Sequence, residues 1–173
     1  MKQLLIVVDM QNDFVSGALG TAEARAILPA VNAKIAAAER IIFTLDTHGT
    51  DYLSTQEGRN LPVAHCIKDT WGHALADGMC VPTGATLLEK PTFGSLALGE
   101  LVCRLFEKNE IDSVELIGLC TDICVISNAL LLKACCAELP VSVDAACCAG
   151  VTPESHQNAL NAMKMCQITV VNE

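Results

Sequence analysis

DSVELIG, at residues 112–118, is an apolar run of strand length, and DICVISNALLLKACCA, at residues 122–137, follows it with the length and composition of a helix. A strand that passes into a helix is the repeating unit of a parallel sheet. The same alternation recurs on both sides of this stretch, around an irregular segment at residues 47–85. Further strands are expected at residues 3–9, 40–46, 86–90, 139–144 and 166–171, and further helices at residues 22–39, 95–108 and 153–164.

The predicted strands are continuous apolar runs, which are typical of a parallel sheet covered on both faces. The chain has 173 residues, the usual size of one domain, and no repeat or linker interrupts it. We therefore expect residues 1–173 to form a single three-layer, doubly wound α/β domain with a mostly parallel sheet of about six strands. Ligands of such sheets bind beyond the carboxyl ends of the strands.

The composition excludes several classes of protein. Hydrophobic residues make up 51% of the chain and charged residues 18%, which excludes a disordered chain. The net charge is -9 and Lys and Arg form no cluster, so we expect neither a nucleic acid nor a membrane as partner. The apolar run at residues 4–8 is too short for a signal peptide or a membrane span, and a cytoplasmic location is expected.

The ten cysteines form no Cys-x-x-Cys pair. In a reducing compartment we expect no disulfide framework, and most of these thiols should be small buried hydrophobic groups. Cys124 is the exception, for the reason given next. The others are Cys66, Cys80, Cys103, Cys120, Cys135, Cys136, Cys147, Cys148 and Cys166.

Reactive side chains stand at the ends of three predicted strands. Asp9 ends the first strand, Lys90 ends the third, and Cys124 opens the helix that follows the fourth. The carboxyl ends of parallel strands share one edge of the sheet, so these groups should converge. A helix start favours a thiolate nucleophile, and its free N–H groups can receive an oxyanion. The alternatives are a capping aspartate, a solvated lysine and a buried structural thiol.

A second candidate site consists of Asp46, His48, Glu57 and His65. Asp46 and His48 are two residues apart, so both side chains point the same way from an extended segment. Carboxylates and imidazoles suit Zn²⁺, Mn²⁺ or Fe²⁺. The alternative is a loop of ordinary surface residues. His73 and His156 lack such partners and are predicted at the surface.

Three motifs together resemble one known family. They are DMQNDF at residues 9–14, KPTF at residues 90–93 and GLCTDICV at residues 118–125. In this order and spacing they resemble the motifs of the isochorismatase-like cysteine hydrolases, over nearly the whole chain. The Asp46-x-His48 pair and the later His65 resemble the metal ligands of the nicotinamidase branch of that family.

The resemblance implies a catalytic triad of Asp9, Lys90 and Cys124. It also implies a non-proline cis peptide between Leu119 and Cys120, and an oxyanion hole formed by the backbone N–H groups of Cys120 and Cys124.

The resemblance further implies one divalent metal ion per chain, most simply Zn²⁺, with Mn²⁺ and Fe²⁺ as alternatives. Its remaining protein ligand varies within the branch, so Glu57 fits and Ser54 is the second choice. The chain lacks the aromatic residue often found just before the ligand corresponding to His65. Phe14 and Phe93 are therefore the candidates for contact with the substrate ring.

The reaction implied is hydrolysis of a small carboxamide, most simply nicotinamide to nicotinate and ammonia, through a Cys124 thioester. One alternative is an isochorismatase-type reaction or hydrolysis of another small amide or carbamoyl compound on the same fold. A non-enzymatic alternative is a metal-binding or redox-sensing protein. The Ala-rich helices at residues 22–39 and 122–137 also favour a homo-oligomer.

Overall fold

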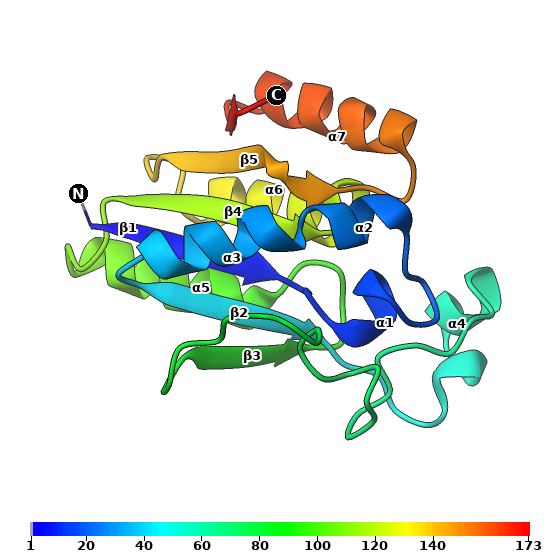
Figure 1. The fold of residues 1–173 in the computed structure, drawn as a ribbon. Helices are drawn as coiled ribbons and strands as arrows, with labels where there is room; N and C mark the ends of the chain where they lie inside the picture. The colour runs from blue at the N-terminus through cyan, green and yellow to red at the C-terminus, as the bar shows by residue number, and fades with distance from the viewer. Residues whose placement is uncertain (1) are drawn as a thin grey trace.

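The computed structural model describes residues 2–173 and contains one parallel sheet of six strands (Figure 1). The strand order across the sheet is β3-β2-β1-β4-β5-β6, and every neighbouring pair is parallel. This confirms the predicted doubly wound α/β fold. The strands are β1 (Gln3–Val8), β2 (Ile41–Asp46), β3 (Thr86–Lys90), β4 (Ser113–Leu119), β5 (Val141–Ala149) and β6 (Thr169–Val171).

Helices cover both faces of the sheet. Residues of α1 to α3 pack in one hydrophobic cluster, and residues of α5 to α7 pack in a second cluster on the opposite face (Figure 1). No helix within residues 2–173 is long and apolar enough to cross a membrane. The helices are α1 (Asn12–Val15), α2 (Ala22–Ala26), α3 (Leu28–Ala37), α4 (Gln56–Asn60), α5 (Leu96–Glu107), α6 (Ile126–Cys135) and α7 (Pro153–Met165).

The central strand β1 shows why the sheet needs two helical layers. Successive side chains of a strand point to opposite faces. Leu4 and Ile6 accordingly join one hydrophobic cluster, whereas Leu5 and Val7 join the other. All four are buried, so the strand has no solvent face and its sequence is a continuous apolar run.

The order of the strands places the functional edge. From β1 the chain moves outward to β2 and β3, and it then returns to the other side of β1 for β4, β5 and β6. The strand order therefore reverses between β1 and β4, which is where ligands bind in open α/β sheets. Asp9 follows β1 at this point, and the segment containing Cys124 follows β4.

Several predicted boundaries differ from the structure. The last strand covers only Thr169–Val171 of the expected residues 166–171, α6 is shorter than the expected 122–137, and α4 lies within the segment expected to be irregular. The helix expected at residues 22–39 is two helices that meet at Ile27, because Pro29 in the first turn of α3 has no N–H to continue the hydrogen bonding of α2. The strand expected at residues 139–144 extends to Ala149. Its last residues are small and buried, and they pair with the end of β4 after an irregularity in the register.

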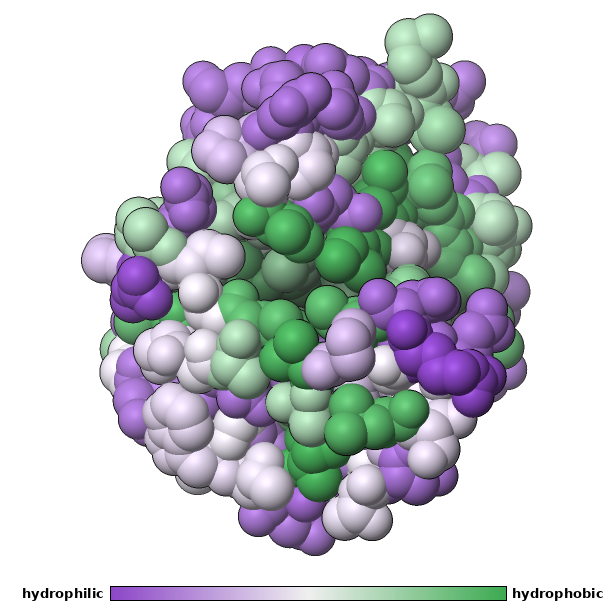
Figure 2. Space-filling model, turned by 90° about the vertical axis from the view of Figure 1, so that its right-hand side faces the viewer, coloured by the Kyte–Doolittle hydropathy of each residue, from purple (hydrophilic) through white to green (hydrophobic). Residues whose placement is uncertain are grey.

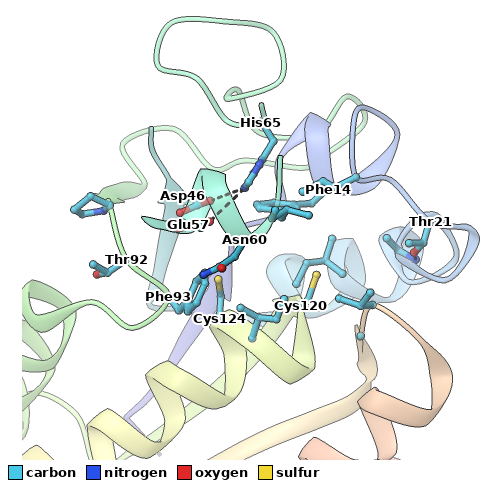
Figure 3. A pocket seen from close by; sticks show the side chains of 18 of the residues that line it. Phe14, Thr21, Asp46, Glu57, Asn60, His65, Thr92, Phe93, Cys120 and Cys124 are labelled. Carbon is cyan, nitrogen blue, oxygen red and sulfur yellow. Dashed lines mark hydrogen bonds and ion pairs between the residues drawn. The ribbon is translucent and has the colours of Figure 1, made fainter. Parts of the chain in front are cut away.

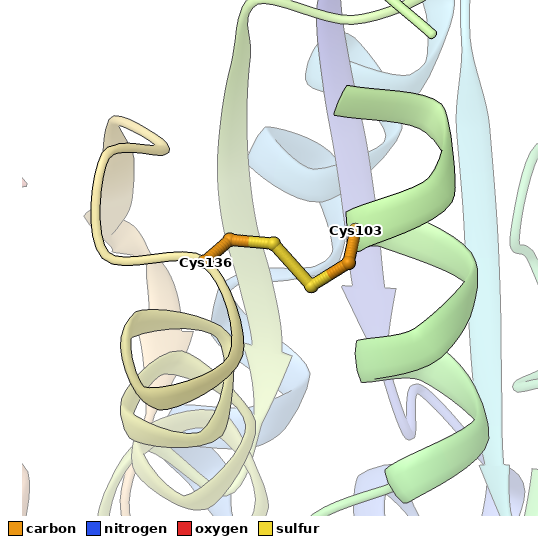
Figure 4. Close-up of a disulfide and its surroundings, with 2 residues drawn as sticks. All are labelled: Cys103 and Cys136. Atoms are coloured by element: carbon orange, nitrogen blue, oxygen red, sulfur yellow. A yellow bond between two sulfur atoms is a disulfide. The ribbon is translucent and has the colours of Figure 1, made fainter. Parts of the chain in front are cut away.

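The expectation that the thiols are unpaired and mostly buried is wrong in two respects. Cys103 of α5 and Cys136 after α6 form a disulfide, with their Cα atoms 6.0 Å apart (Figure 4). The two helices pack side by side on one face of the sheet, a long-range contact that the spacing of the cysteines does not reveal. In addition, Cys80, Cys135 and Cys166 are exposed.

Candidate active site

Three residues predicted to converge do meet beyond the carboxyl ends of the central strands. Lys90 Nζ lies 2.6 Å from Asp9 Oδ2 and 3.4 Å from Cys124 Sγ, to which it donates a hydrogen bond. All three side chains are buried, and Lys90 is only 1% exposed. A lysine is almost never buried without a partner. The solvated lysine and the surface aspartate are thereby excluded as alternatives.

Asp9 is fixed in place by its own backbone and by a neighbouring strand. Its φ of 47° lies in the left-handed region, which turns the chain sharply at the end of β1. The Thr44 hydroxyl, on β2, donates a hydrogen bond of 2.7 Å to Asp9 Oδ1. The remaining oxygen, Oδ2, faces Lys90. The carboxylate therefore has a defined orientation toward the thiol side of the site.

Cys124 lies in a short π turn, η2 (Thr121–Val125), that begins directly after β4 and continues into α6. The Leu119–Cys120 peptide before it is cis, as the resemblance implies. The Asn128 side chain supports the turn from within, since its Nδ2 donates to the carbonyl oxygen of Cys124 at 2.8 Å and to that of Phe93 at 3.1 Å. Asn128 thus joins the nucleophile segment to the loop that follows Lys90.

Burial dominates the electrostatics of this cluster. It raises the pKa of the Cys124 thiol well above its ordinary value, and the negative charge of Asp9 acts in the same direction. It also raises the pKa of Asp9, although the Lys90 ammonium opposes this. Burial alone would lower the pKa of Lys90, but Asp9, Cys124 and Asp46 together raise it above its ordinary value. Burial therefore opposes the preference for a thiolate that the helix start gives Cys124.

The second predicted group also converges. One donor atom from each of Asp46, His48, Glu57 and His65 lies within 4.8 Å of the others. Asp46 Oδ2 is 3.0 Å from His48 Nε2 and 3.5 Å from His65 Nε2. Glu57 Oε1 is 3.5 Å from the same nitrogen of His48. Two carboxylates and two imidazoles facing one point fit a divalent metal ion.

The surroundings of this group orient its members as a metal site requires. The other ring nitrogen of His65, Nδ1, lies 2.8 Å from the carbonyl oxygen of Val63, which leaves Nε2 free to face the cluster. Glu57 stands in α4 and completes the group, whereas Ser54 is exposed in the preceding turn η1 (Tyr52–Ser54). The geometry of the described residues thus favours Glu57 over Ser54 as the fourth member.

The sequence reasoning missed two residues that hold the group together. Gln11 donates from Nε2 to the carbonyl oxygen of Asp46 at 2.8 Å and accepts from the N–H of Asp46 at 2.8 Å. The Tyr52 ring packs against both imidazoles, with its centroid 4.6 Å from that of His48 and 4.9 Å from that of His65. Gln11 belongs to the DMQNDF motif at residues 9–14, and its place in that motif could have identified it as a site residue. Tyr52 is the only tyrosine of the chain, and nothing in its sequence context marked it.

One cavity of about 690 Å³ is bordered by Cys124 from the first group and by Asp46, Glu57 and His65 from the second. In Figure 3, Cys120 and Cys124 rise from one side, and Asp46, Glu57 and His65 face them from the other. Phe14 and Phe93 also line the cavity, as candidates for substrate contact should. Figure 2 shows the hollow with hydrophobic side chains around it, and the exposed apolar residues among its lining are Leu61, Phe93 and Val151.

Two histidines predicted at the surface are not free side chains. His73 is buried, and its Nε2 lies 2.9 Å from the Thr47 hydroxyl. His156 is half-buried, and its Nδ1 lies 2.8 Å from the Thr121 hydroxyl. In each case the partner comes from a distant part of the chain, so packing of the fold decides the environment and local sequence does not.

The whole described fold corresponds to one known family. The sequence matches the family model described as the isochorismatase domain over residues 3–173. The chain belongs to the isochorismatase family. This membership and the relatives described next confirm the predicted resemblance, including its nicotinamidase branch, and confirm that the chain is a hydrolytic enzyme.

The similar proteins span most of this chain. A nicotinamidase of Saccharomyces cerevisiae (strain ATCC 204508 / S288c) is 26% identical, covering 73% of this chain and 79% of the relative. An uncharacterized isochorismatase family protein of Bacillus subtilis (strain 168) is 30% identical, covering 75% and 78%. Among solved structures, the pyrazinamidase of Pyrococcus horikoshii in complex with zinc superposes with a TM-score of 0.83 at 28% identity, covering 100% of both chains.

Proposed function

We propose that this chain hydrolyses a small carboxamide, most simply nicotinamide to nicotinate and ammonia, through a thioester on Cys124. The observation that carries the proposal is the contact of Lys90 Nζ with both Asp9 and Cys124 Sγ at the border of an apolar cavity. A thiol, a base and a cation in contact are the parts needed for nucleophilic catalysis. The family and its nicotinamidase relatives supply the reaction class.

In the first half of the reaction, Asp9 takes the proton of the Cys124 thiol, and the sulfur attacks the amide carbon. The tetrahedral intermediate places its oxyanion toward the backbone N–H groups of Cys120 and Cys124. Asp9 then gives the proton to the leaving nitrogen, and ammonia departs. General acid–base help of this kind contributes about 10²–10⁴-fold and an oxyanion donor about 10²–10³-fold.

In the second half, water attacks the thioester while Asp9 accepts one of its protons. The proton returns to the sulfur of Cys124, and nicotinate leaves. Lys90 keeps its positive charge beside Asp9 throughout, and it is the nearest cation to the sulfur whenever the sulfur is an anion. The Lys90 charge is balanced by Asp9 while that carboxylate is ionised, and by the sulfur or the oxyanion while Asp9 holds the proton.

The metal ligands in this proposal are Asp46, His48, Glu57 and His65, with Zn²⁺ as the simplest ion and Mn²⁺ or Fe²⁺ as alternatives. A divalent ion held there supplies a Lewis-acidic position that can bind a ring nitrogen of the substrate. The cluster stands across the cavity from Cys124, so this position would orient the amide for attack (Figure 3). Phe14 and Phe93, which also line the cavity, are proposed to contact the substrate ring.

The other readings are weaker on specific grounds. Isochorismatase-type members generally lack such a metal cluster, so the four converging ligands count against vinyl ether cleavage. A metal-storage protein would use its thiols as ligands, yet within residues 2–173 the candidate ligand group contains no cysteine. A cytoplasmic location and a homo-oligomeric state stay predictions of the sequence.

The test is ammonia release from nicotinamide by the purified protein, before and after treatment with a chelator. Release that is lost on chelation and restored by zinc, manganese or iron supports the substrate and the metal site together. Release that survives complete removal of metal would contradict the metal's role. No release from any metal-loaded form would contradict nicotinamide as substrate and move attention to other small amides.

A further inference from the structure

The turn that carries Cys124 is held from outside the site by a histidine. Thr121, the first residue of this turn, is 0% exposed, and its hydroxyl shares a hydrogen bond of 2.8 Å with Nδ1 of His156. His156 stands in the first turns of α7, which is 35 residues further along the chain. No group of His156 is needed for the reaction proposed above, so the contact requires another explanation.

The close approach of α7 to this turn depends on a glycine. Gly150 lies between β5 and α7, and a Cβ at this position would stand 2.9 Å from both the Cβ and the backbone nitrogen of His156. Such a distance is shorter than a real contact, so any larger residue would push α7 away. Gly150 also lines the cavity. The N-terminal end of α7 therefore packs closely against the wall of the cavity.

A second contact ties the same two segments together. Asp122, the residue after Thr121, accepts hydrogen bonds from the N–H of Val151 at 3.1 Å and 3.2 Å. Val151 follows Gly150 and lines the cavity. Two consecutive residues of the π turn are thus anchored, Asp122 to the backbone of the segment between β5 and α7 and Thr121 to an imidazole of α7 itself.

The charges around His156 are consistent with a neutral ring at neutral pH. Burial lowers its pKa below the ordinary value, while the carboxylates of Asp122 and Glu173 oppose this. Thr121, the group in contact with the ring, carries no charge. A neutral imidazole has one donor and one acceptor nitrogen, so it can form a stable hydrogen bond with a hydroxyl.

We propose that His156 is a positioning residue that fixes, through Thr121, the orientation of the turn carrying Cys124. Thr121 directly follows Cys120 and lies three residues before Cys124, the two residues whose backbone N–H groups are proposed to hold the oxyanion. If the buried Thr121 hydroxyl loses its partner, the turn can rotate and those N–H groups move. This inference rests on the proposed function. A displacement of about 1 Å at a reacting centre can cost as much as about 10²-fold in rate.

The test compares variants on both sides of the hydrogen bond. His156→Ala removes the partner, whereas His156→Asn keeps a polar atom near the place of Nδ1. Thr121→Val removes the hydroxyl at nearly constant shape, whereas Thr121→Ser keeps it. Gln157→Ala, an exposed neighbour in α7, is the matched control.

With nicotinamide as substrate, we expect His156→Ala and Thr121→Val each to lower kcat about tenfold, with KM and metal content unchanged. His156→Asn, Thr121→Ser and Gln157→Ala should stay within about threefold of the wild type. The double variant His156→Ala/Thr121→Val should be no slower than either single variant, because both remove one contact. A kcat unchanged in His156→Ala, or lowered equally in His156→Asn, would overturn the proposal.

A second readout separates this inference from the choice of substrate. The rate of Cys124 alkylation by iodoacetamide, measured on its peptide by mass spectrometry, requires no substrate. We expect this rate to fall in His156→Ala and to recover in His156→Asn. Equal alkylation rates in wild type and His156→Ala would contradict the positioning role. Failure of the wild type to hydrolyse nicotinamide would contradict the proposed function alone.

Discussion

Lys90 Nζ lies 3.5 Å from Asp46 Oδ1, so the ammonium that contacts the Cys124 thiol also contacts a carboxylate of the candidate metal site. The other oxygen of Asp46 faces His48 at 3.0 Å. The two halves of the site are therefore one electrostatic unit, with Lys90 at its centre. A substitution in the metal-site group should therefore alter the electrostatic environment of Cys124, and a substitution at Lys90 should alter that of Asp46.

Replacing Lys90 with Met should destabilise the protein as well as abolish turnover. The change leaves the Asp9 carboxylate buried without its cation, and breaking a buried pair in this way costs about 3–5 kcal/mol. Urea unfolding would measure the loss. The matched control is Lys68→Met, which removes the exposed 2.6 Å ion pair with Glu89 and should change stability little. Equal losses in the two variants would contradict the central place of Lys90.

Replacing His48 with Ala should lower the bound metal and raise KM, with a smaller effect on kcat. The proposed role of the metal is to orient the substrate, and His48 is one of its four proposed ligands. Metal analysis of the purified variant and steady-state kinetics check this. His73→Gln is the control, because His73 contacts Thr47 and is not a member of the cluster. Unchanged metal content in His48→Ala would remove His48 from the site.

Replacing Asn128 with Ala should weaken both the fold and the nucleophile turn. Its buried amide serves the backbone of Cys124, Phe93 and Ser95, and each group left without a partner costs about 1–3 kcal/mol. We expect a lower unfolding midpoint and a lower kcat. Asn161→Ala, at an exposed position of α7, is the control. A variant as stable as the control would contradict this account of Asn128.

The pair of carboxylates around Lys34 predicts a pH dependence of stability. Lys34 Nζ, in α3, lies 3.0 Å from Glu115 of β4 and 2.7 Å from Asp144 of β5. None of the three residues belongs to the active-site groups. Burial lowers the pKa of Lys34, but the two carboxylates raise it more, so the net shift is above the ordinary 10.5.

A raised lysine pKa in the folded state means that this stabilisation is complete below pH 10.5 and is lost as the pH rises through the folded value. We therefore expect the free energy of unfolding to fall more steeply above this pH in the wild type than in Lys34→Met. Other groups titrate in the same range, and the variant subtracts their contribution. Identical slopes in the two proteins would show that Lys34 does not contribute.

The convergence of the residues at the strand ends could be predicted from the sequence, because the topology of the sheet alone brings them together. Asp9, Lys90 and Cys124 each follow an apolar run, and any parallel sheet in this order gathers such positions at one edge. Asp46 and His48 were predictable for the same reason. Because they are two residues apart in an extended segment, their side chains point in the same direction, independently of the conformation of the rest of the loop.

What the sequence could not indicate depends on packing between distant segments. The burial of His73 and His156, the contact of Tyr52 with the imidazoles and the disulfide between Cys103 and Cys136 all arise where separate elements meet. The state of Cys124 is a further case. Its place at a helix start favours a thiolate, but burial, which only the structure reveals, raises the pKa of the thiol.

The most direct test of the central claim is to capture the reaction on Cys124. The protein is mixed with nicotinamide and quenched in acid within the first turnover, and the peptide containing Cys124 is examined by mass spectrometry. We predict a nicotinoyl thioester on this peptide, absent in a Cys124→Ala variant that folds, binds metal and releases no ammonia. Ammonia release by Cys124→Ala at the wild-type rate would contradict the covalent mechanism.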